Sequence, residues 1–489
     1  MKNLLRNEKG SMTVLVTVVI LSFVIILLSV FAIANSIRKN QLRTELKIKE
    51  VYEQDVILSD TIKADGSYNE EKGVNTPNLG EGMIPIKWDE NLNSGNGNWV
   101  ITTAEDSEWY DYNEKQWANV MLSDGTYATK DLIESGEASG KQEAISGTEV
   151  SQSDLGSMFV WIPRFAYSIT NGYHKSGADL NKAVPSQGAG TIEVEFMRGL
   201  ANETSTGRRE FDNATGEGNW NIHPAFEYGE TIAGIWVAKF EASHSDAQAG
   251  IMGSSQTIKI VPSVSSWKNL SVGTAYSNCI NYNKALNSHL IKNSEWGAIA
   301  YLSKSKYGKE TEEIYINNSS RGITGASGSS SVANTNVSVN EDYTSFQGVK
   351  ASTTGNVYGI YDMNGGAWEY VAAYLGDNSL TLNAAGDMLT SSDVRTKEIY
   401  VSVGSAREEE YEANNEKYGD AIYEISKVAN AKNGSWYSDY STFVNRGASI
   451  FLRGGMYSDG QNAGIFAFNS YVIGLLQTNN SFRPVLIKM

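Results

Sequence analysis

Cysteine is almost absent from this sequence. Its 489 residues include a single cysteine, Cys279, so no disulfide can form within the chain and no thiolate cluster can hold a metal ion. Only four histidines are present, and no two of them have the HExxH spacing of a zinc site. The sequence also has no P-loop and no G-x-S-x-G motif. These absences argue against a metalloprotease, a P-loop nucleotidase and a serine hydrolase.

Basic residues and proline are also scarce. Lys and Arg number 40 against 56 Asp and Glu, which gives a formal net charge of −16 and argues against a nucleic-acid partner. There are 7 Pro but 46 Gly and 26 Tyr, a balance that favours turns, loops and sheet over a helical bundle. We therefore expect a globular, strand-rich protein, and the lack of disulfides fits a bacterial surface better than a eukaryotic exterior.

The N-terminus contains one long apolar run. Residues 12–34 form an almost unbroken apolar run, which follows the basic residues Lys2, Arg6 and Lys9. About 20 apolar residues suffice to cross a bilayer, and no A-x-A-like cleavage site follows. We predict a signal-anchor over residues 1–36, with the N-terminus inside, a single membrane span and the C-terminal domain outside the cell.

The same run leaves a second interpretation open. Lys9-Gly10 followed by apolar residues resembles a type IV prepilin leader, which is cut after the glycine. Such leaders have glutamate at the fifth position after the cut, whereas this chain has Leu15. A pilin-like structural protein therefore remains an alternative.

The body of the chain predicts an α+β fold. Residues 37–82 are charged and then polar and Gly-rich, which indicates a stalk and linker. Short apolar runs separated by turn residues predict a β-rich extension over 83–157 and continue beyond it. One helical region is predicted over 276–302, where Ser294 would cap a second helix.

The C-terminal stretch 451–486 differs from the rest of the body. Its apolar residues occur in consecutive pairs and triples, such as 471–473 and 475–476, among Asn and Gly. A half-buried strand would alternate with period two, so the pattern predicts loops. Because large apolar side chains on a loop usually contact a partner, the stretch is a candidate binding face.

Four motifs occur in a family order. SEWGAIAYL (294–302), NVYGIYDMNGGAWEY (356–370), LRGGMYSDG (452–460) and SFRPVL (481–486) resemble the successive signatures of formylglycine-generating-enzyme-like domains. The resemblance covers residues 158–489 and implies a C-type-lectin-related fold of irregular strands around two helices.

Within that family the chain is most similar to the variable proteins of diversity-generating retroelements. In those proteins an error-prone reverse transcriptase rewrites adenines in a C-terminal segment, here 451–486. An Asn codon altered at its first two bases can encode Ser, Tyr, Val, Ile, Leu, Thr or Asp, which accounts for most of the unrelated residues in this stretch. Met456 and Gln477 do not fit such a codon. The alternative is an ordinary polar surface loop.

The resemblance implies a division of the C-terminal region into binding and scaffold residues. It places an unknown protein or glycan ligand on the variable residues Met456, Ser458, Asp459, Gln461, Ser470, Tyr471, Val472, Ile473, Leu475, Leu476, Gln477 and Thr478. It assigns the scaffold to Trp368, Glu369, Arg453, Gly454, Gly455, Phe482 and Arg483.

We expect no enzymatic activity and no cofactor. The enzymes of the formylglycine-generating family bind copper through a pair of cysteines near the C-terminus, and this chain has only Cys279, far from that region. A formylglycine-generating-type enzyme stays open as an alternative that this absence disfavours. Calcium is bound by some lectin-like folds, but no aspartate spacing identifies a site here.

Overall fold

The computed structural model of the chain divides into two compact units, residues 1–66 and 67–489. In the first, it describes residues 15–31 and a few further helical residues up to 47. In the second it describes, besides a few single residues, 67–170, 189–213, 218–244, 257–333, 341–376, 386–403, 413–426, 433–472 and 478–489. The sequence predicts a linker up to residue 82, but the folded unit begins at Ser67, and Val74 and Asn75 are fully buried in it.

The first unit contains an apolar helix, Leu15–Lys39, whose most apolar window has a mean hydropathy of 3.1. Its 25 residues rise by roughly 37 Å at about 1.5 Å per residue, more than the ~30 Å hydrocarbon core of a bilayer. The helix is therefore long and apolar enough to cross a membrane, in agreement with the predicted span, although a signal sequence has the same length and composition.

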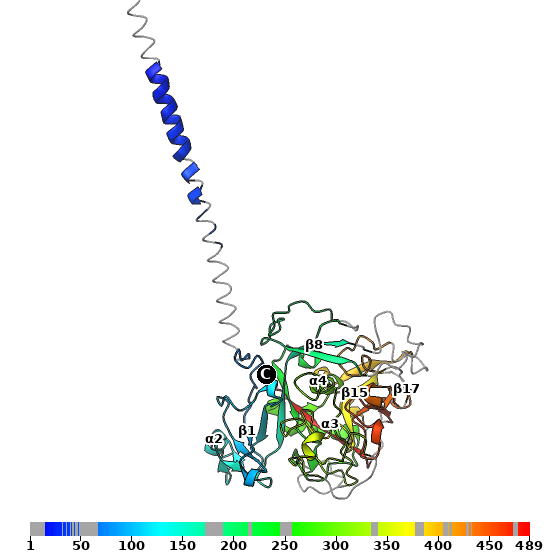
Figure 1. The fold of residues 1–489 in the computed structure, drawn as a ribbon. Helices are drawn as coiled ribbons and strands as arrows, with labels where there is room; N and C mark the ends of the chain where they lie inside the picture. Colours follow the sequence, from blue (N-terminus) through cyan, green and yellow to red (C-terminus); the bar gives the residue numbers. More distant parts are fainter. Residues whose placement is uncertain are drawn as a thin grey trace, which may run out of the picture. The chain divides into compact units, whose positions relative to one another are not determined.

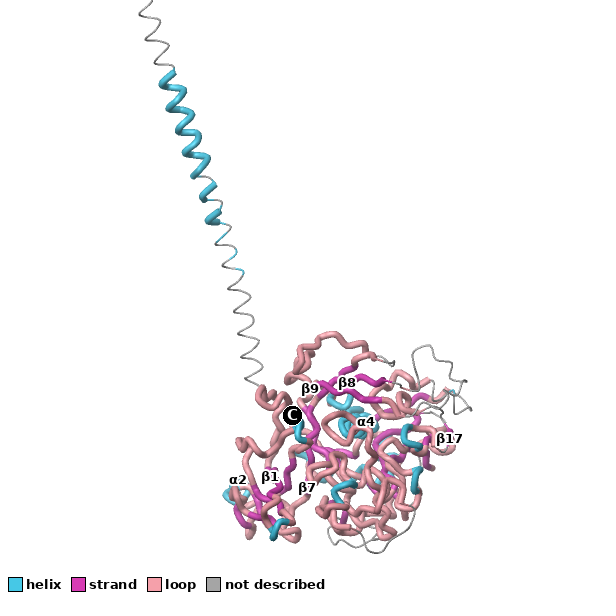
Figure 2. Tube along the Cα trace, in the orientation of Figure 1, coloured by secondary structure: helices cyan, strands magenta, loops and turns pink. Residues whose placement is uncertain are grey.

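The second unit is a mixed α+β structure in which strands predominate (Figures 1 and 2). Its largest sheet has eight strands in the order β14-β22-β11-β7-β3-β1-β2-β6. Their bounds are β14 His289–Leu290, β22 Pro484–Leu486, β11 Gly234–Ala238, β7 Met158–Pro163, β3 Asn119–Leu122, β1 Met83–Asp89, β2 Asn98–Ile101 and β6 Glu149–Val150. Because β7 and β11 are buried along their whole length, the core lies at the centre of this sheet.

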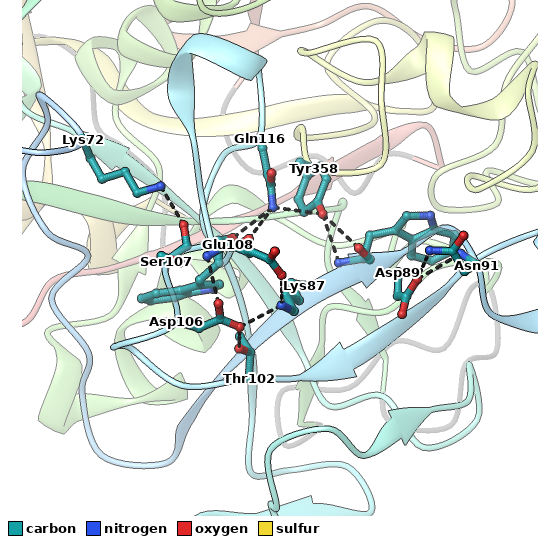
Figure 3. Close-up of polar contacts among 12 residues, drawn as sticks. Lys72, Lys87, Asp89, Asn91, Thr102, Asp106, Ser107, Glu108, Gln116 and Tyr358 are labelled. Carbon is teal, nitrogen blue, oxygen red and sulfur yellow. Dashed lines mark hydrogen bonds and ion pairs between the residues drawn. The ribbon is translucent and has the colours of Figure 1, made fainter.

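Residues 83–157 share this sheet with the C-terminal strand β22, and a polar network adds a second connection (Figure 3). The hydroxyl oxygen of Tyr358 accepts a hydrogen bond from the Trp88 backbone N–H at 3.1 Å. It also accepts one from the Gln116 side-chain amide at 3.1 Å. Since Tyr358 belongs to the motif over 356–370, the network ties the N-terminal strands to the motif region.

A buried lysine strengthens the same junction. The Lys239 ammonium, at the end of β11, donates to Asn119 Oδ1 at 2.8 Å and to the carbonyl oxygens of Val357 and Gly359 at 2.6 and 2.8 Å. Burial holds the pKa of Lys239 well below its usual range. Three acceptors satisfy its three donors, so the group joins β3, β11 and the segment after residue 356.

The second large sheet carries the C-terminal stretch. Its order is β16-β15-β19-β20-β18-β17, and β21 pairs with β15. The bounds are β16 Glu398–Val401, β15 Trp368–Gly376, β19 Ile450–Arg453, β20 Phe468–Tyr471, β18 Ser441–Thr442, β17 Asn430–Ala431 and β21 Asn480–Phe482.

The prediction that 451–486 consists of loops is therefore partly wrong, since β20, β21, β22 and most of β19 lie within it. Consecutive residues of β19, among them Phe451 and Leu452, are all buried. A strand buried on both faces has no alternation of apolar and polar residues, which is why the period-two test missed it.

The remaining elements lie outside the two large sheets. Three strands form a separate sheet, β10 (Asn221–Ile222), β8 (Phe165–Thr170) and β9 (Thr191–Phe196). Two pairs complete the strands, β12 (Ser243–His244) with β13 (Ile258–Lys259) and β4 (Tyr127–Ala128) with β5 (Gln142–Glu143). The helices are α2 Lys130–Glu134, α3 Val272–Tyr282, α4 Asn293–Ser303 and α5 Asp387–Thr390.

The predicted helical region is two helices, α3 and α4, and every residue of α4 is buried. Ser294 does not cap α4: the helix begins at Asn293, and the backbone N–H of Ser294 donates to the Glu398 carboxylate at 3.2 Å. Glu295 instead accepts the backbone N–H of Lys292 at 2.8 Å. The N-cap is Lys292, two residues before the predicted Ser294. The Glu295 carboxylate, rather than the Ser294 hydroxyl, accepts a backbone N–H at the start of the helix.

Candidate functional site

The candidate site is built on the hairpin formed by β19 and β20. Arg453 pairs with Phe468 at one end of this hairpin. On the other side of β19, Arg453 pairs with Glu369 of β15, which in turn pairs with Ser481 of β21. Four strands therefore place these residues in one row, and the loop 454–467 begins directly after that row.

The loop 454–467 is held by its own backbone. Gly454 and Gly455 have φ of +87° and +82°, a conformation that glycine adopts without steric cost. A Cβ added to Gly455 would lie 2.6 Å from Ala463, so the two arms of the loop are in close contact. The backbone N–H of Gly464 donates to the Gly454 carbonyl at 3.0 Å. These contacts hold the two arms of the loop together through backbone atoms.

Trp296 of α4 lies beneath this loop as a buried platform. Its indole N–H donates to the Ile465 carbonyl at 2.7 Å. The guanidinium groups of Arg453 and Arg483 lie 5.6 and 5.7 Å from the centre of the indole ring. Cation–π contacts of this kind are worth roughly 2 kcal/mol or more when they are desolvated. Trp296 therefore links the first motif to the third and fourth.

Arg483 and Glu369 form a fully buried ion pair. Arg483 Nε donates to Glu369 Oε2 at 2.7 Å, and a terminal nitrogen donates to Oε1. The other guanidinium donors reach the carbonyl oxygens of Ala238 and Tyr361, each at 3.1 Å. The pair is thus bidentate, and four of the five guanidinium donors are hydrogen-bonded, which is the geometry that makes burial of two charges tolerable.

Two further carboxylates share this environment. Glu241 accepts the Ala367 N–H at 2.8 Å, and Glu241 and Asp362 are both buried. Burial, and then the neighbouring carboxylates, raise the pKa of Glu241 well above its usual value. Burial also raises the pKa of Asp362 and Glu369, and the Arg483 guanidinium opposes that rise in both. Arg483 therefore offsets the charge of three buried carboxylates.

Arg453, the other predicted scaffold arginine, is bound mainly by neutral oxygens. It donates to the backbone carbonyl oxygens of Asp420 at 2.9 Å and Ala421 at 3.1 Å. The Asp420 side chain accepts the Tyr400 hydroxyl at 2.8 Å, and burial raises the pKa of Asp420 to about 7. Arg453 thus fixes the 420–421 segment against the row of strands that carries the hairpin.

The structure describes eight of the twelve predicted ligand-binding residues. All eight are at least partly exposed, and the exposed fraction of Val472 is 46%; they are Met456, Ser458, Asp459, Gln461, Ser470, Tyr471, Val472 and Thr478. The other four, Ile473, Leu475, Leu476 and Gln477, lie outside the described residues. All seven predicted scaffold residues are buried: Trp368, Glu369, Arg453, Gly454, Gly455, Phe482 and Arg483.

Seven of the eight described positions fall at two ends of one hairpin, and Thr478 precedes β21. Residues 456–461 follow the last residue of β19, whereas 470–472 lie at the far end of β20. The four residues of β20 span about 10 Å at about 3.4 Å per residue. Asp459 also serves the fold, because its carboxylate accepts the Met456 N–H at 3.0 Å. That the exposed side chains act together as one binding patch stays a prediction.

Several residues that support the site were not identified from the sequence. Trp296 occurs in a motif, but nothing in the pattern shows that it contacts both arginines. Asp439 accepts the Phe466 N–H at 2.9 Å and lies where a Cβ on Gly464 would clash. No local pattern marks Asp439 or Glu241, because the contacts that define them are distant in sequence.

The residues that the structure describes contain no group of three or more His, Cys, Asp or Glu placed to hold a metal ion. His289 is buried, with Nε2 2.9 Å from Glu295 Oε1. Cys279 is buried in α3, and burial raises the pKa of its thiol well above the usual range. Such a thiol is protonated at neutral pH and is a poor nucleophile.

No family model matches the chain, and no curated protein matches it. Among solved structures, PvdO from Pseudomonas aeruginosa is 10% identical, with 68% of this chain and 95% of that chain covered and a TM-score of 0.27. The Major Tropism Determinant I1 and M1 variants are each 12% identical, with 85% of this chain and 74% of those chains covered and TM-scores of 0.26. At these TM-scores the likenesses carry no argument about fold or function.

Proposed function

We propose that the chain is a surface-displayed ligand-binding protein whose C-terminal region, 451–486, recognises an unknown protein or glycan. In this proposal the region is the variable segment of a diversity-generating retroelement protein, and the body is a formylglycine-generating-enzyme-like, C-type-lectin-related domain. The function is recognition alone, with no catalytic step and no cofactor.

One observation carries the proposal: exposed and buried side chains are separated sharply along the hairpin. Residues 463–468 are all buried, whereas the described variable positions on either side of them are exposed or half-buried. The loop backbone is fixed mainly by Gly454, Gly455 and the Trp296 indole, and among the variable positions by Asp459, whose carboxylate accepts the Met456 N–H. Changing the exposed residues therefore changes the surface with little effect on the fold.

A fixed backbone also favours binding. Ordering a flexible loop costs roughly 0.5–1.5 kcal/mol per immobilised side chain, and a preorganised loop avoids part of that cost. Tyr471 and Val472 offer apolar area for an anchor, while Ser458, Asp459 and Gln461 offer polar groups that adapt to different partners. The arrangement resembles an antibody paratope in its physical logic.

A selection experiment tests the proposal. A library of the full chain, randomised at the twelve variable positions and displayed on cells, is sorted for binding to one defined target, hen lysozyme. We expect folded clones that bind lysozyme. A control library randomised at twelve exposed positions on β5, α2 and their flanks should yield far fewer. Equal recovery from the two libraries would contradict a dedicated binding face.

We further propose that the helix Leu15–Lys39 anchors the chain in the cell membrane, with the body outside. Protease added to intact cells should then remove the part beyond residue 43, and protection until lysis would contradict this topology. The proposed rewriting has its own test in the neighbouring DNA, which should hold a near-copy of the last coding stretch, with adenines at the variable codons, beside a reverse-transcriptase gene.

A further inference from the structure

A polar cavity of about 730 Å³ opens next to the helix α4, outside the variable segment. Lys309, Lys350, Tyr315, Ser331 and Thr354 are among its lining residues, together with three glutamates. The volume falls in the range of roughly 300–1,000 Å³ that small-molecule sites occupy. None of these residues has a role in the proposed function.

Of the two lysines at one wall of this cavity, Lys309 has a long ion pair with Glu312, and Lys350 has no carboxylate partner in the described part of the chain. Lys309 has only 5% of its side chain exposed, yet its ammonium group lies 3.8 Å from the nearest Glu312 oxygen and 3.5 Å from the Lys350 carbonyl. In the described part of the chain, Lys350 has no carboxylate oxygen within 4.0 Å. Both ammonium groups lie over the Tyr315 ring, at 5.7 and 5.5 Å. Two cations are therefore gathered at one wall.

The other charged groups at the cavity are mostly engaged elsewhere. Lys115 and Glu310 pair with each other at 3.4 Å. Glu312 directs its side chain to solvent, with 81% of it exposed. Burial raises the pKa of Glu313, and Lys304, a hydrogen bond with the Ser331 side chain and Lys309 oppose that rise. Within a strongly acidic chain, Lys350 without a carboxylate partner and Lys309 with only a long ion pair to an exposed carboxylate mark a local site for an anion.

An exposed aromatic ring lies beside the lining residue Lys350. Phe346 is 84% exposed, the largest exposed fraction among the large apolar side chains of the described residues. The Lys350 ammonium lies 4.4 Å from its ring centre, so Lys350 connects this ring to the Tyr315 wall. An exposed ring beside cations and hydroxyl groups offers one apolar face and several polar contacts to the same ligand.

We propose that this cavity binds an acidic saccharide, a sugar unit that bears a carboxylate or a sulfate. The anionic group lies against the ammonium groups of Lys309 and Lys350. The apolar face of the sugar ring packs on Phe346, and the hydroxyl groups of Ser331 and Thr354 contact the sugar hydroxyls. The proposal stands apart from the variable face and holds whether or not that face binds a ligand.

The cavity is nevertheless close to the hairpin loop. Ile316, next to the wall residue Tyr315, packs in one buried cluster with Ala463 of the loop 454–467. The Asn364 side chain donates to the carbonyl oxygens of Ile314 at 2.7 Å and Ser331 at 3.3 Å, and so holds the wall in place. A fixed saccharide site thus lies beside a surface whose side chains are proposed to vary.

Ligand-observed NMR on the full chain in detergent tests the proposal. The probes are glucuronic acid and N-acetylneuraminic acid, with glucose, inorganic sulfate and inorganic phosphate as comparisons. We expect both acidic sugars to bind, with affinity that falls as salt is raised because the contact is electrostatic. Lys350→Gln and Phe346→Ala should each weaken binding at least tenfold. Both side chains are at or near the surface, so both variants should fold.

Two matched variants control for general surface effects. Lys130→Gln removes an exposed lysine and Ile145→Ala an exposed apolar side chain, both outside the cavity, and neither should change binding. The proposal is overturned if neither acidic sugar binds, or if Lys350→Gln and Phe346→Ala leave the affinity unchanged. Inorganic anions that bind as tightly as the acidic sugars, or glucose that competes equally, would overturn the assignment to an acidic saccharide.

Discussion

Arg483→Met is expected to lower the free energy of unfolding by about 3–5 kcal/mol, the cost of removing one partner from a buried ion pair. Arg483 offsets the charge of Glu369 and influences Asp362 and Glu241 as well. Without it, Glu369 and Asp362 lose the cation that opposes the rise in their pKa, while Glu241 keeps an interaction with Lys268. Urea unfolding of the full chain in detergent measures the loss.

The loss should depend on pH in a defined direction. Burial already raises the folded-state pKa of Glu369 above its unfolded value, and the positive charge of Arg483 limits that rise. Loss of Arg483 therefore raises the pKa of Glu369 further. A carboxyl group with a raised folded pKa stabilises the fold below its unfolded pKa, near 4.3, and that contribution disappears as pH rises through the folded pKa. The variant should therefore lose more stability at pH 8 than at pH 5.

An exposed ion pair provides the control. Arg209 pairs with Glu203 at 2.9 Å, but 70% of the Arg209 side chain is exposed. Arg209→Met should change the free energy of unfolding by less than about 1 kcal/mol, with little dependence on pH. Adding Glu369→Gln to Arg483→Met should recover part of the stability at pH 8. Equal losses at the two arginines would contradict the role assigned to the buried pair.

Trp296→Ala is the second change with a large expected effect. Truncating a buried tryptophan costs roughly 3–5 kcal/mol. It also removes the hydrogen bond to the Ile465 carbonyl and the ring between the two arginines. Because that bond fixes the loop 454–467, backbone amides of the loop should exchange with solvent faster in the variant. Hydrogen exchange with mass spectrometry measures the effect.

A second buried tryptophan separates the loss of stability from the loss of loop order. Trp117 is also fully buried, and its indole N–H donates to the Tyr307 carbonyl at 2.9 Å, away from the hairpin. Trp117→Ala should cost a similar amount of stability under the same conditions. If it accelerated exchange in the loop 454–467 as much as Trp296→Ala does, Trp296 would have no special relation to the hairpin.

Local patterns predicted the features that depend on neighbouring residues. The apolar run over 12–34 has the length of a membrane span without any contribution from the rest of the chain, and a helix is found there. Turn residues between short apolar runs likewise predicted a strand-rich body. The sequence also identified Trp368, Glu369, Arg453 and Arg483 as scaffold residues, and all four are buried.

Features that depend on distant contacts could not be predicted. β19 is fully buried between β15 and β20, so its composition lacks the alternation that identifies a strand. Glu241 precedes Asp362 and Glu369 by more than a hundred residues, and the three meet only in the folded chain. The lysines at the proposed saccharide site, Lys309 and Lys350, are ordinary surface residues by sequence.

The most direct test of the proposed binding face compares the stability of a variant with eight substitutions with that of the single variant Trp296→Ala. In a single variant the eight described variable positions are replaced together: Met456→Ser, Ser458→Tyr, Asp459→Asn, Gln461→Ser, Ser470→Thr, Tyr471→Asn, Val472→Ser and Thr478→Asn. Asparagine at 459 keeps an acceptor oxygen for the Met456 N–H. The free energy of unfolding of the eightfold variant is then measured beside that of Trp296→Ala.

Substitutions at exposed positions usually change stability by no more than about 0.5 kcal/mol each, with either sign, so Met456 and Tyr471, which pack against the core, should account for most of the loss. We expect the eightfold variant to remain within about 2 kcal/mol of the parent chain, and therefore to be more stable than Trp296→Ala. An eightfold variant that unfolds, or that loses more stability than Trp296→Ala, would show that the fold depends on these side chains, and the proposed variable binding face would be contradicted.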